Sequence, residues 1–376
     1  MKELLNYALA HADDTMETLR TMVEMESFTA DTPSVDKLSS YIKERLETLG
    51  ALVEVISQTE AGNHLLAEWG EGKDQILILC HMDTVWSTGT LQNMPFRVQD
   101  GLVSGPGILD MKAGIAILLH ALDALNNLGL SPQRRVKMVF NSDEEVGSTT
   151  SRALIEEEAR KSAHVFVLEP AAGSGGALKI GRKGVGMFQL KVTGRASHAG
   201  NEPEKGISAV EELAHQIIRL HSFTDLEIGT TVNVGVMSGG SVRNQIAPFA
   251  EGLVDLRVAT MSEADRVTEE ILALKPSLPG AVVEITGGMN RLPMEKTPAT
   301  ARLLESARSI SEPLGIELGE AHVGGGSDAQ FASAMGVAVL DGLGGVGEGP
   351  HAAHEHIIAA ELPRRVALLA SLLMGT

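Results

Sequence analysis

The chain has 376 residues, enough for two domains, and its 43% hydrophobic and 21% charged residues are typical of a soluble globular protein. Its 49 Asp+Glu against 31 Lys+Arg give a formal net charge of −18, which repels phosphate backbones and anionic lipids and favours cations. Nucleic acid and membranes are therefore poor candidate partners. With one cysteine, the chain cannot form an intrachain disulfide. It has no apolar run of roughly 20 residues and no leader-like segment, so we expect a soluble, cytoplasmic protein.

The first half of the chain alternates helical and strand patterns. Apolar residues recur with helical spacing in Met1–Met25, Val35–Leu49, Lys112–Leu128 and Ser151–Lys161. Short, almost wholly apolar strands are predicted at Leu52–Ile56, Leu65–Trp69, Ile76–Cys80, Val136–Phe140 and Val165–Leu168. Helices between apolar strands predict an α/β fold, with a mixed or parallel sheet flanked by helices on both faces.

The second half begins with a Gly-rich stretch, Gly173–Gly186, that is typical of a hinge or linker. A strand–helix–strand–strand–helix–strand order follows at Met187–Thr193, Ser208–Leu220, Thr231–Met237, Ala250–Val258, Glu263–Leu274 and Ala281–Gly287. This βαββαβ order is the ferredoxin-like motif. We expect it to form an inserted domain over residues 181–293, between the two parts of the first domain at 1–180 and 294–376. The α/β pattern resumes near Pro298 and ends in a helix at Ala360–Leu373.

Potential metal ligands follow three of the predicted strands. His81 comes directly after one strand, the pair Glu144-Glu145 follows the next, and Glu169 follows the third. Because ligands of open α/β sheets bind at the carboxyl ends of the strands, these side chains are expected to meet at one edge. Asp110 lies just before a long helix and could join them.

Several carboxylates in one cleft would repel one another or become protonated unless cations hold them. Two divalent cations would stabilise the cluster, and a histidine with carboxylates around each ion suits zinc in a catalytic site. Such a pair of ions can activate water and polarise a carbonyl group. Sites with oxygen and nitrogen ligands also accept Co²⁺ or Mn²⁺.

Several motifs together resemble one enzyme family. They are HMDTV, GPGILDMKAG, NSDEEVGS, LEPA, RKGVG, GRASHAG and GPHAAHEH. The chain resembles the dinuclear zinc metallopeptidases that include glutamate carboxypeptidase, acetylornithine deacetylase and succinyl-diaminopimelate desuccinylase, over most of its length. The glutamate carboxypeptidase (carboxypeptidase G) pattern is the most similar. The resemblance implies a zinc-exopeptidase-like fold with an inserted lid and dimerisation domain.

The resemblance also assigns ligands to two zinc ions. His81, Asp110 and Glu169 would bind one ion, and Asp110, Glu145 and His354 would bind the other. Asp110 would therefore bridge the two ions.

Three further features of the metal site come from the resemblance. Glu144 would be the general base, taking a proton from water and passing it to the leaving amine. Asp83 would orient His81 through the second nitrogen of its ring. A cis peptide bond is expected at Asp110–Met111.

The inserted domain would contribute residues that contact the substrate. By resemblance, His198 reaches the active site of a partner subunit and stabilises the oxyanion. Asn244 and Arg257 match residues that hold a free substrate carboxylate, and a guanidinium pairs well with a carboxylate. Gly325, in the loop Gly324–Asp328, would line the same pocket. The expected assembly is a homodimer formed through this domain.

Structural alternatives apply to the candidate residues. Glu144 and Glu145 could form a solvated acidic turn, but a buried strand leads directly into them. His354 competes with His351 and His356 in the same loop, and the family motif selects His354.

Structural roles that involve neither substrate nor metal apply to further candidate residues. His198 could cap a helix or lie on the lid surface, and Asn244 and Arg257 could bond within the lid sheet. Cys80 precedes a ligand, but the alternation of side chains along a strand turns it away from the direction of His81.

The predicted function is metal-dependent hydrolysis that releases a C-terminal amino acid, with glutamate as a candidate, from a peptide or N-acyl amino acid. An N-acyl amino-acid deacylase is the main alternative, because both enzymes cut an amide beside a free carboxylate. An aminopeptidase is less favoured, since related aminopeptidases usually carry Asp in place of Glu169. A catalytically inactive, metal-stabilised binding protein is disfavoured by Glu144 and the full ligand set. The pattern leaves the substrate side chain open.

Overall fold

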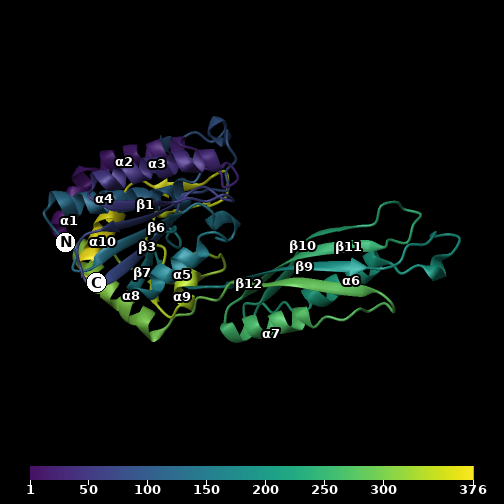
Figure 1. The fold of residues 1–376 in the computed structure, drawn as a ribbon. Coiled ribbons are helices and arrows are strands. Elements are labelled where there is room, and N and C mark those ends of the chain that lie inside the picture. Colours follow the sequence, from purple (N-terminus) through teal and green to yellow (C-terminus); the bar gives the residue numbers. More distant parts are fainter. Residues whose placement is uncertain (376) are drawn as a thin grey trace. The chain divides into compact units, whose positions relative to one another are not determined.

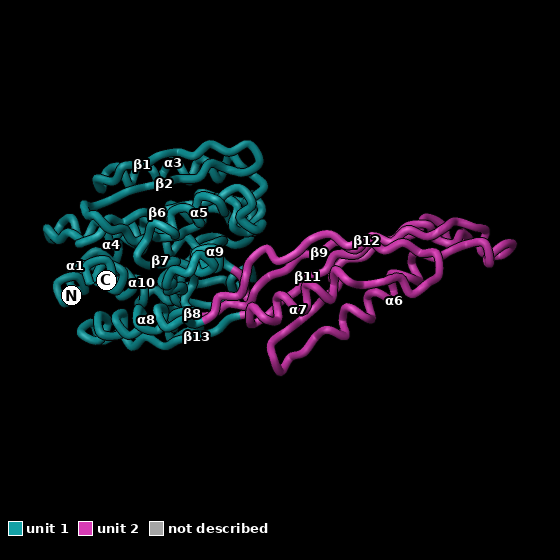
Figure 2. Tube along the Cα trace, turned by 60° about the horizontal axis from the view of Figure 1, so that its bottom comes forward, with its two compact units in different colours: residues 1–180, 296–323, 327–376 teal, residues 181–295, 324–326 magenta. Residues whose placement is uncertain are grey.

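The computed structural model describes residues 1–375, which form two compact units (Figure 2). Unit 1 contains Met1–Ile180, Lys296–Val323 and the chain from Ser327 onward. Unit 2 contains Gly181–Glu295 and Gly324–Gly326. The inserted unit therefore extends to Glu295 and includes three residues of a later loop, where the sequence indicated residues 181–293.

Unit 1 is built around a mixed six-stranded sheet with the order β1-β2-β6-β3-β7-β14. These strands are β1 (Leu52–Ile56), β2 (His64–Trp69), β3 (Gln75–His81), β6 (Arg135–Asn141), β7 (Ser162–Val167) and β14 (Ala338–Leu340). β3 runs parallel to β6 and β7, and β14 runs parallel to β7. β2 runs antiparallel to both of its neighbours, the edge strand β1 and the inner strand β6. The predicted mixed sheet is confirmed.

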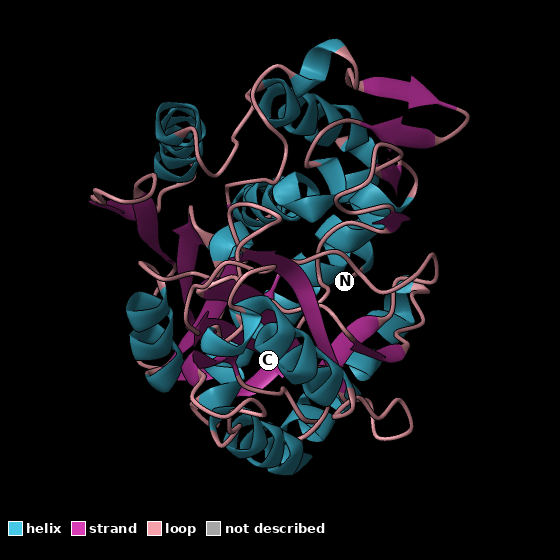
Figure 3. Cartoon of the chain, turned by 90° about the vertical axis from the view of Figure 1, so that its right-hand side faces the viewer, coloured by secondary structure: helices cyan, strands magenta, loops and turns pink. Residues whose placement is uncertain are grey.

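Helices cover both faces of this sheet (Figures 1 and 3). They are α1 (Lys2–Ala10), α2 (Ala12–Glu24), α3 (Thr32–Thr48), α4 (Ala113–Asn127), α5 (Arg152–Arg160), α8 (Pro298–Ser311), α9 (Ala329–Ala334) and α10 (Glu361–Gly375). The main core joins α4 and α10 to alternate residues of β3, namely Ile76, Ile78 and Cys80. α5 and α9 pack against β3, β7 and β14 outside that core. Every residue of β3 is buried, as expected for a strand covered on both sides.

The N-terminal segment differs from the single helix predicted for Met1–Met25. It forms α1 and α2, and the two helices meet at His11, where the backbone has φ −111° and ψ 24°. The His11 ring stacks on the ring of Tyr7, with 4.0 Å between centroids. Helical spacing of apolar residues continues across the break, so the sequence pattern does not reveal it.

The Gly-rich stretch is more ordered than the predicted hinge. It contains β8 (Leu178–Arg182), whose five residues are all buried and which pairs with β13 (Glu320–Val323). The turn is limited to the residues around Gly173 and Gly176, which both have positive φ. The apolar alternation in LKIGR is the signal for a strand here.

A small antiparallel sheet was also missed. Its order is β15-β16-β5-β4, with β4 (Arg97–Gln99), β5 (Leu102–Ser104), β15 (Gly347–Glu348) and β16 (His356–Ile358). Asp100 and Gly101 join β4 to β5 with φ of 51° and 78°. An Asp-Gly pair between two short strands is a strong hairpin signal. The sheet joins the segment before α4 to the loop before α10.

Unit 2 has the predicted βαββαβ order. Its elements are β9 (Gly184–Thr193), α6 (Ala209–His221), β10 (Thr231–Gly239), β11 (Phe249–Val258), α7 (Met261–Leu272) and β12 (Val282–Arg291). They form an antiparallel sheet with the order β10-β11-β9-β12, and both helices pack into a core of their own. Within the described residues, none of the helices is both long and apolar enough to cross a membrane.

Candidate metal centre

The centre forms where three neighbouring parallel strands of unit 1 end. His81 is the last residue of β3 and pairs with Asn141, the last residue of β6. Glu144 and Glu145 follow β6 in a short 3₁₀ turn, and Glu169 lies two residues after β7. The sequence placed these residues at strand ends, and the structure brings them to one edge of the sheet.

The first group of ligand atoms comprises His81, Asp110 and Glu169. His81 Nε2 lies 3.1 Å from Asp110 Oδ1 and 3.5 Å from Glu169 Oε1. The other ring nitrogen, Nδ1, lies 2.9 Å from the main-chain oxygen of Asp83. Because a carbonyl oxygen can only accept, Nδ1 donates to it, and Nε2 is the nitrogen left for a metal ion.

The second group comprises Asp110, Glu145 and His351. His351 Nε2 lies 3.5 Å from Asp110 Oδ2 and 3.1 Å from Glu145 Oε2. Asp110 thus offers one carboxylate oxygen to each group. This is the arrangement that a bridging carboxylate requires.

The structure does not bring His354 to the other candidate ligands, and His351 lies beside them instead. The turn before β16 has positive φ at Gly349 and His351, and it directs the His351 ring to Asp110 and Glu145. The ring of His354 is exposed and lies over Gly349 instead. Three histidines stand within six residues of this loop, so only the conformation of the turn separates them.

The separations between the ligand atoms fit small divalent ions. Metal–ligand bonds of 2.0–2.2 Å in tetrahedral geometry place neighbouring ligand atoms roughly 3.4 Å apart. The nitrogen–oxygen distances in the two groups are 3.1–3.5 Å. Imidazole and carboxylate ligands suit zinc, cobalt or manganese. The residues present therefore fit a pair of metal ions.

The electrostatics of the cluster point the same way. Hydrogen bonds to Asp110 and Glu145 raise the pKa of His351 to about 10. Burial would lower the pKa of His81, but the neighbouring carboxylates of Asp110, Asp83 and Glu169 outweigh burial and raise that pKa well above its usual value. Both shifts arise because clustered carboxylates stabilise positive charge nearby. The same field favours bound cations.

Asp83 supports the centre differently from the sequence-based expectation. Its main-chain carbonyl, rather than its carboxylate, holds His81, since Oδ1 lies 3.6 Å from Nδ1. The buried carboxylate accepts the backbone N–H groups of Glu144 and Glu145, both at 3.2 Å, and the hydroxyl of Thr29 at 2.8 Å. Asp83 therefore positions the turn that carries both glutamates. The peptide bond Asp110–Met111 is cis, as predicted.

The four candidates in unit 2 belong to local networks within that unit. His198 Nδ1 accepts the N–H groups of Gly200 and Asn201, both at 3.1 Å, so Nε2 carries the proton and can donate. The backbone of the same loop pairs with that of Asn244, whose carbonyl accepts from Ala199.

The other two candidates already have partners within unit 2. The Arg257 guanidinium forms a two-pronged pair with Asp255, with both distances 2.9 Å. The carbonyls of Gly325 and Gly326 accept from the Arg182 guanidinium at 3.0 and 2.8 Å. Their contact with substrate stays a prediction.

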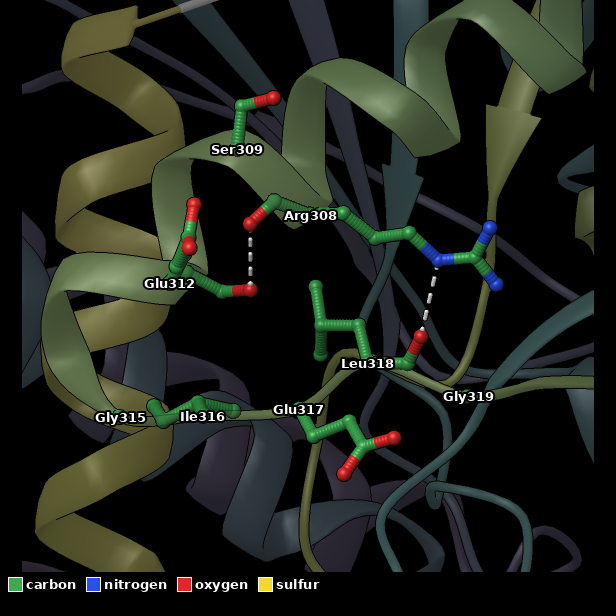
Figure 4. A pocket seen from close by; sticks show the side chains of 9 residues that line it. Arg308, Ser309, Glu312, Gly315, Ile316, Glu317, Leu318 and Gly319 are labelled. Atoms are coloured by element: carbon green, nitrogen blue, oxygen red, sulfur yellow. Dashed lines mark hydrogen bonds between the residues drawn. The ribbon is translucent and has the colours of Figure 1, made fainter.

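A separate hollow in unit 1 lies at the end of α8 and is lined by Arg308, Glu312, Ile316 and Leu318 (Figure 4). The Arg308 side chain donates to the carbonyl of Leu318 at 3.0 Å and also pairs with glutamates. Among the described residues, groups suited to hold a metal occur only at the strand-end centre.

Comparison with known proteins identifies the family. Residues 77–375 match the model of Peptidase family M20/M25/M40. The chain belongs to this family. It is therefore a metal-dependent hydrolase, in agreement with the two ligand groups and with the resemblance read from the motifs.

Individual relatives place the chain within the family. It is 32% identical to Carboxypeptidase G2 of Pseudomonas sp. (strain RS-16) over 366 residues, which cover 96% of this chain and 88% of the relative. It is 26% identical to the acetylornithine deacetylase of Proteus mirabilis (strain HI4320), covering 70% and 73% of the two chains.

A solved structure shares the fold. The YXEP protein of Bacillus subtilis, described as a dinuclear metal binding peptidase from the M20 family, superposes with a TM-score of 0.70 at 16% identity. The superposition covers 97% of this chain and 98% of that one.

Proposed function

We propose that this hydrolase uses two zinc ions to release a C-terminal amino acid, with glutamate as the first candidate, from a peptide or N-acyl amino acid. The observation that carries the proposal is the pair of ligand groups that share Asp110. The identity of 32% to Carboxypeptidase G2 over almost the whole chain supports the substrate class.

The metal ions would be held by His81, Asp110 and Glu169 on one side and by Asp110, Glu145 and His351 on the other. Bound there, they would act as Lewis acids and lower the pKa of coordinated water. The residues of the chain would supply orientation and proton transfer.

Glu144 is the proposed general base. It lies in the same short turn as the ligand Glu145, and Asp83 holds the backbone of both. Glu144 would take the proton of the attacking water and deliver it to the leaving nitrogen, so that the amide cleaves to a free amine and a carboxylic acid.

Unit 2 would supply substrate contacts. His198 would donate from Nε2 to the developing oxyanion, and Asn244 and Arg257 would hold the free carboxylate of the substrate. Gly325 would line the same pocket. The role of His198 across subunits implies a homodimer formed through unit 2. The single cysteine and the acidic composition favour a cytoplasmic location.

A deacylase acting on N-acyl amino acids is the second candidate, favoured by the similarity to acetylornithine deacetylase. A substrate panel separates the two. The zinc-loaded enzyme is incubated with dipeptides ending in glutamate, with benzoyl-glutamate, with N-acetylornithine and with N-succinyl amino acids, and the free amine is quantified. Preference for the glutamate compounds supports a carboxypeptidase, preference for acetyl or succinyl compounds supports a deacylase, and turnover of none contradicts both.

A further inference from the structure

One buried carboxylate outside both ligand groups contacts the segment that carries Asp110. The Glu355 side chain is completely buried. Its Oε1 accepts the backbone N–H groups of Leu109 at 2.8 Å and Asp110 at 3.1 Å. Its Oε2 accepts the N–H of Gly107 at 3.1 Å and the Trp86 indole N–H at 2.8 Å.

All four contacts are donors that need an acceptor. A carboxylate has two oxygens and can accept all four bonds, whereas glutamine has one oxygen and an NH₂ group. Replacing Glu355 by glutamine would therefore turn two of the N–H groups toward another donor. Hydrogen bonds to a charged group contribute roughly twice as much as neutral ones, so this contact is a strong constraint on the Gly107–Asp110 turn.

Glu355 is also tied to the turn that presents His351. Its own N–H donates to the carbonyl of Ala352 at 2.8 Å, and the N–H of Ala352 donates to Gly349 at 3.0 Å. The residue after Glu355 begins β16, which pairs His356 with Ser104 of β5. The chain leads from β5 directly into the turn that carries Asp110.

We propose that Glu355 is a positioning residue that fixes Asp110 and His351, two of the three ligands of the second group, relative to each other. This inference rests on the proposed function, since it concerns ions bound at the two groups. His81 and Glu169 of the first group lie on β3 and after β7, outside this network. Loss of the Glu355 contacts should therefore weaken the second ion more than the first.

Zinc titration against a competing chelator tests the proposal, because it yields a dissociation constant for each ion without measuring activity. H351A identifies which constant belongs to the second group. E355Q should raise that constant by about 10–100-fold, the usual effect of changing a residue that orients a ligand. The constant of the first ion should change much less.

A matched control is available in unit 2. Glu212 is also completely buried and accepts the backbone N–H groups of Ser277 and Leu278. E212Q should lower thermal stability while leaving both zinc constants as in the wild type. If E355Q lowers thermal stability but leaves the ratio of the two constants unchanged, as E212Q does, Glu355 only stabilises the fold and the proposal is wrong.

Two further variants cover the remaining outcomes. E355D keeps both oxygens on a shorter side chain and should bind the second ion more tightly than E355Q, whereas the opposite order would mean that Glu355 merely fills space.

If E355Q does not fold, W86F removes a single donor to Glu355. It should raise the dissociation constant of the second ion, but less than expected for E355Q, and an unchanged ratio of the two constants overturns the proposal. Wild-type protein that binds fewer than two ions contradicts the proposed function itself.

Discussion

The candidate residues of the two units differ in how firmly the fold holds them. In unit 1, His81, Asp83 and Glu169 are 2%, 0% and 6% exposed and stand at the ends of a buried sheet. In unit 2, His198 is exposed and Arg257 lies on an open strand face, paired with Asp255. A largely buried set, in which His351 is the exposed member, suits metal binding and proton transfer. An exposed set suits substrate selection, so mutations in the two units should affect different kinetic quantities.

The largest effect is expected from the general base. E144Q should keep both zinc ions and still bind substrate, but should lower kcat by about 10²–10⁴-fold because it cannot accept a proton. Elemental analysis, an inhibitor-binding measurement and kcat check this.

The neighbouring residue provides the control. E145Q should weaken metal binding, since Glu145 belongs to the second ligand group. If E144Q loses an ion, or if its kcat stays near that of the wild type, then Glu144 is not the base and the division of roles between the two glutamates fails.

The next largest effect on zinc binding is expected from the loop that carries His351 and His354. H351A should weaken the second ion by more than 10-fold and reduce activity with it, because the ring lies 3.1–3.5 Å from two carboxylate ligands. H354A should leave zinc binding and kcat close to those of the wild type. Chelator titration of both variants decides the matter, and a larger loss in H354A would restore the assignment read from the sequence.

A change in unit 2 should instead alter substrate preference. R257A should lower kcat/KM for an N-acyl-glutamate roughly 10–100-fold, the effect of losing one hydrogen-bonded charge pair. It should have little effect on the matching α-amide, which lacks the carboxylate, and it should not alter zinc content. Equal losses on both substrates would mean that the Arg257–Asp255 pair only stabilises unit 2.

The strand-end ligands could be predicted because a buried strand leaves a strong apolar signal. His81 ends such a strand, Glu145 and Glu169 follow others within a few residues, and the carboxyl ends of neighbouring parallel strands meet at one edge of the sheet. The βαββαβ order of unit 2 was equally visible, since its helices and strands have clear periodicities.

The features that were missed depend on loop conformation. His351 and His354 differ only in how a turn with positive φ directs their rings. The role of the Glu355 carboxylate depends on a contact with Leu109, 246 residues away in the sequence. No local pattern records such a contact. The β4–β5 hairpin, by contrast, carried its signal in Asp100-Gly101.

The smallest expected effect concerns acid stability, and it applies to unit 1. Burial lowers the pKa of His120 to about 4 and that of His164 to about 4, with Arg45 and Arg134 adding to it. In the unfolded chain both titrate near 6.5. Between pH 6.5 and 4 the unfolded state therefore binds more protons, and the stability of unit 1 should fall as the pH is lowered.

His120 provides the test, since its ring is 6% exposed and hydrogen-bonds the Thr18 hydroxyl at 2.9 Å. Removing one such group should reduce the slope of unfolding free energy against pH by up to about 1.4 kcal/mol per pH unit in this window. Urea unfolding of wild type and H120Q is followed by tryptophan fluorescence in a chelator that removes metal effects. Both tryptophans, Trp69 and Trp86, lie in unit 1, so the signal reports that unit alone. If the plots of unfolding free energy against pH are parallel for the two proteins, burial does not hold His120 neutral. A smaller slope for H120Q between pH 6.5 and 4 supports the prediction.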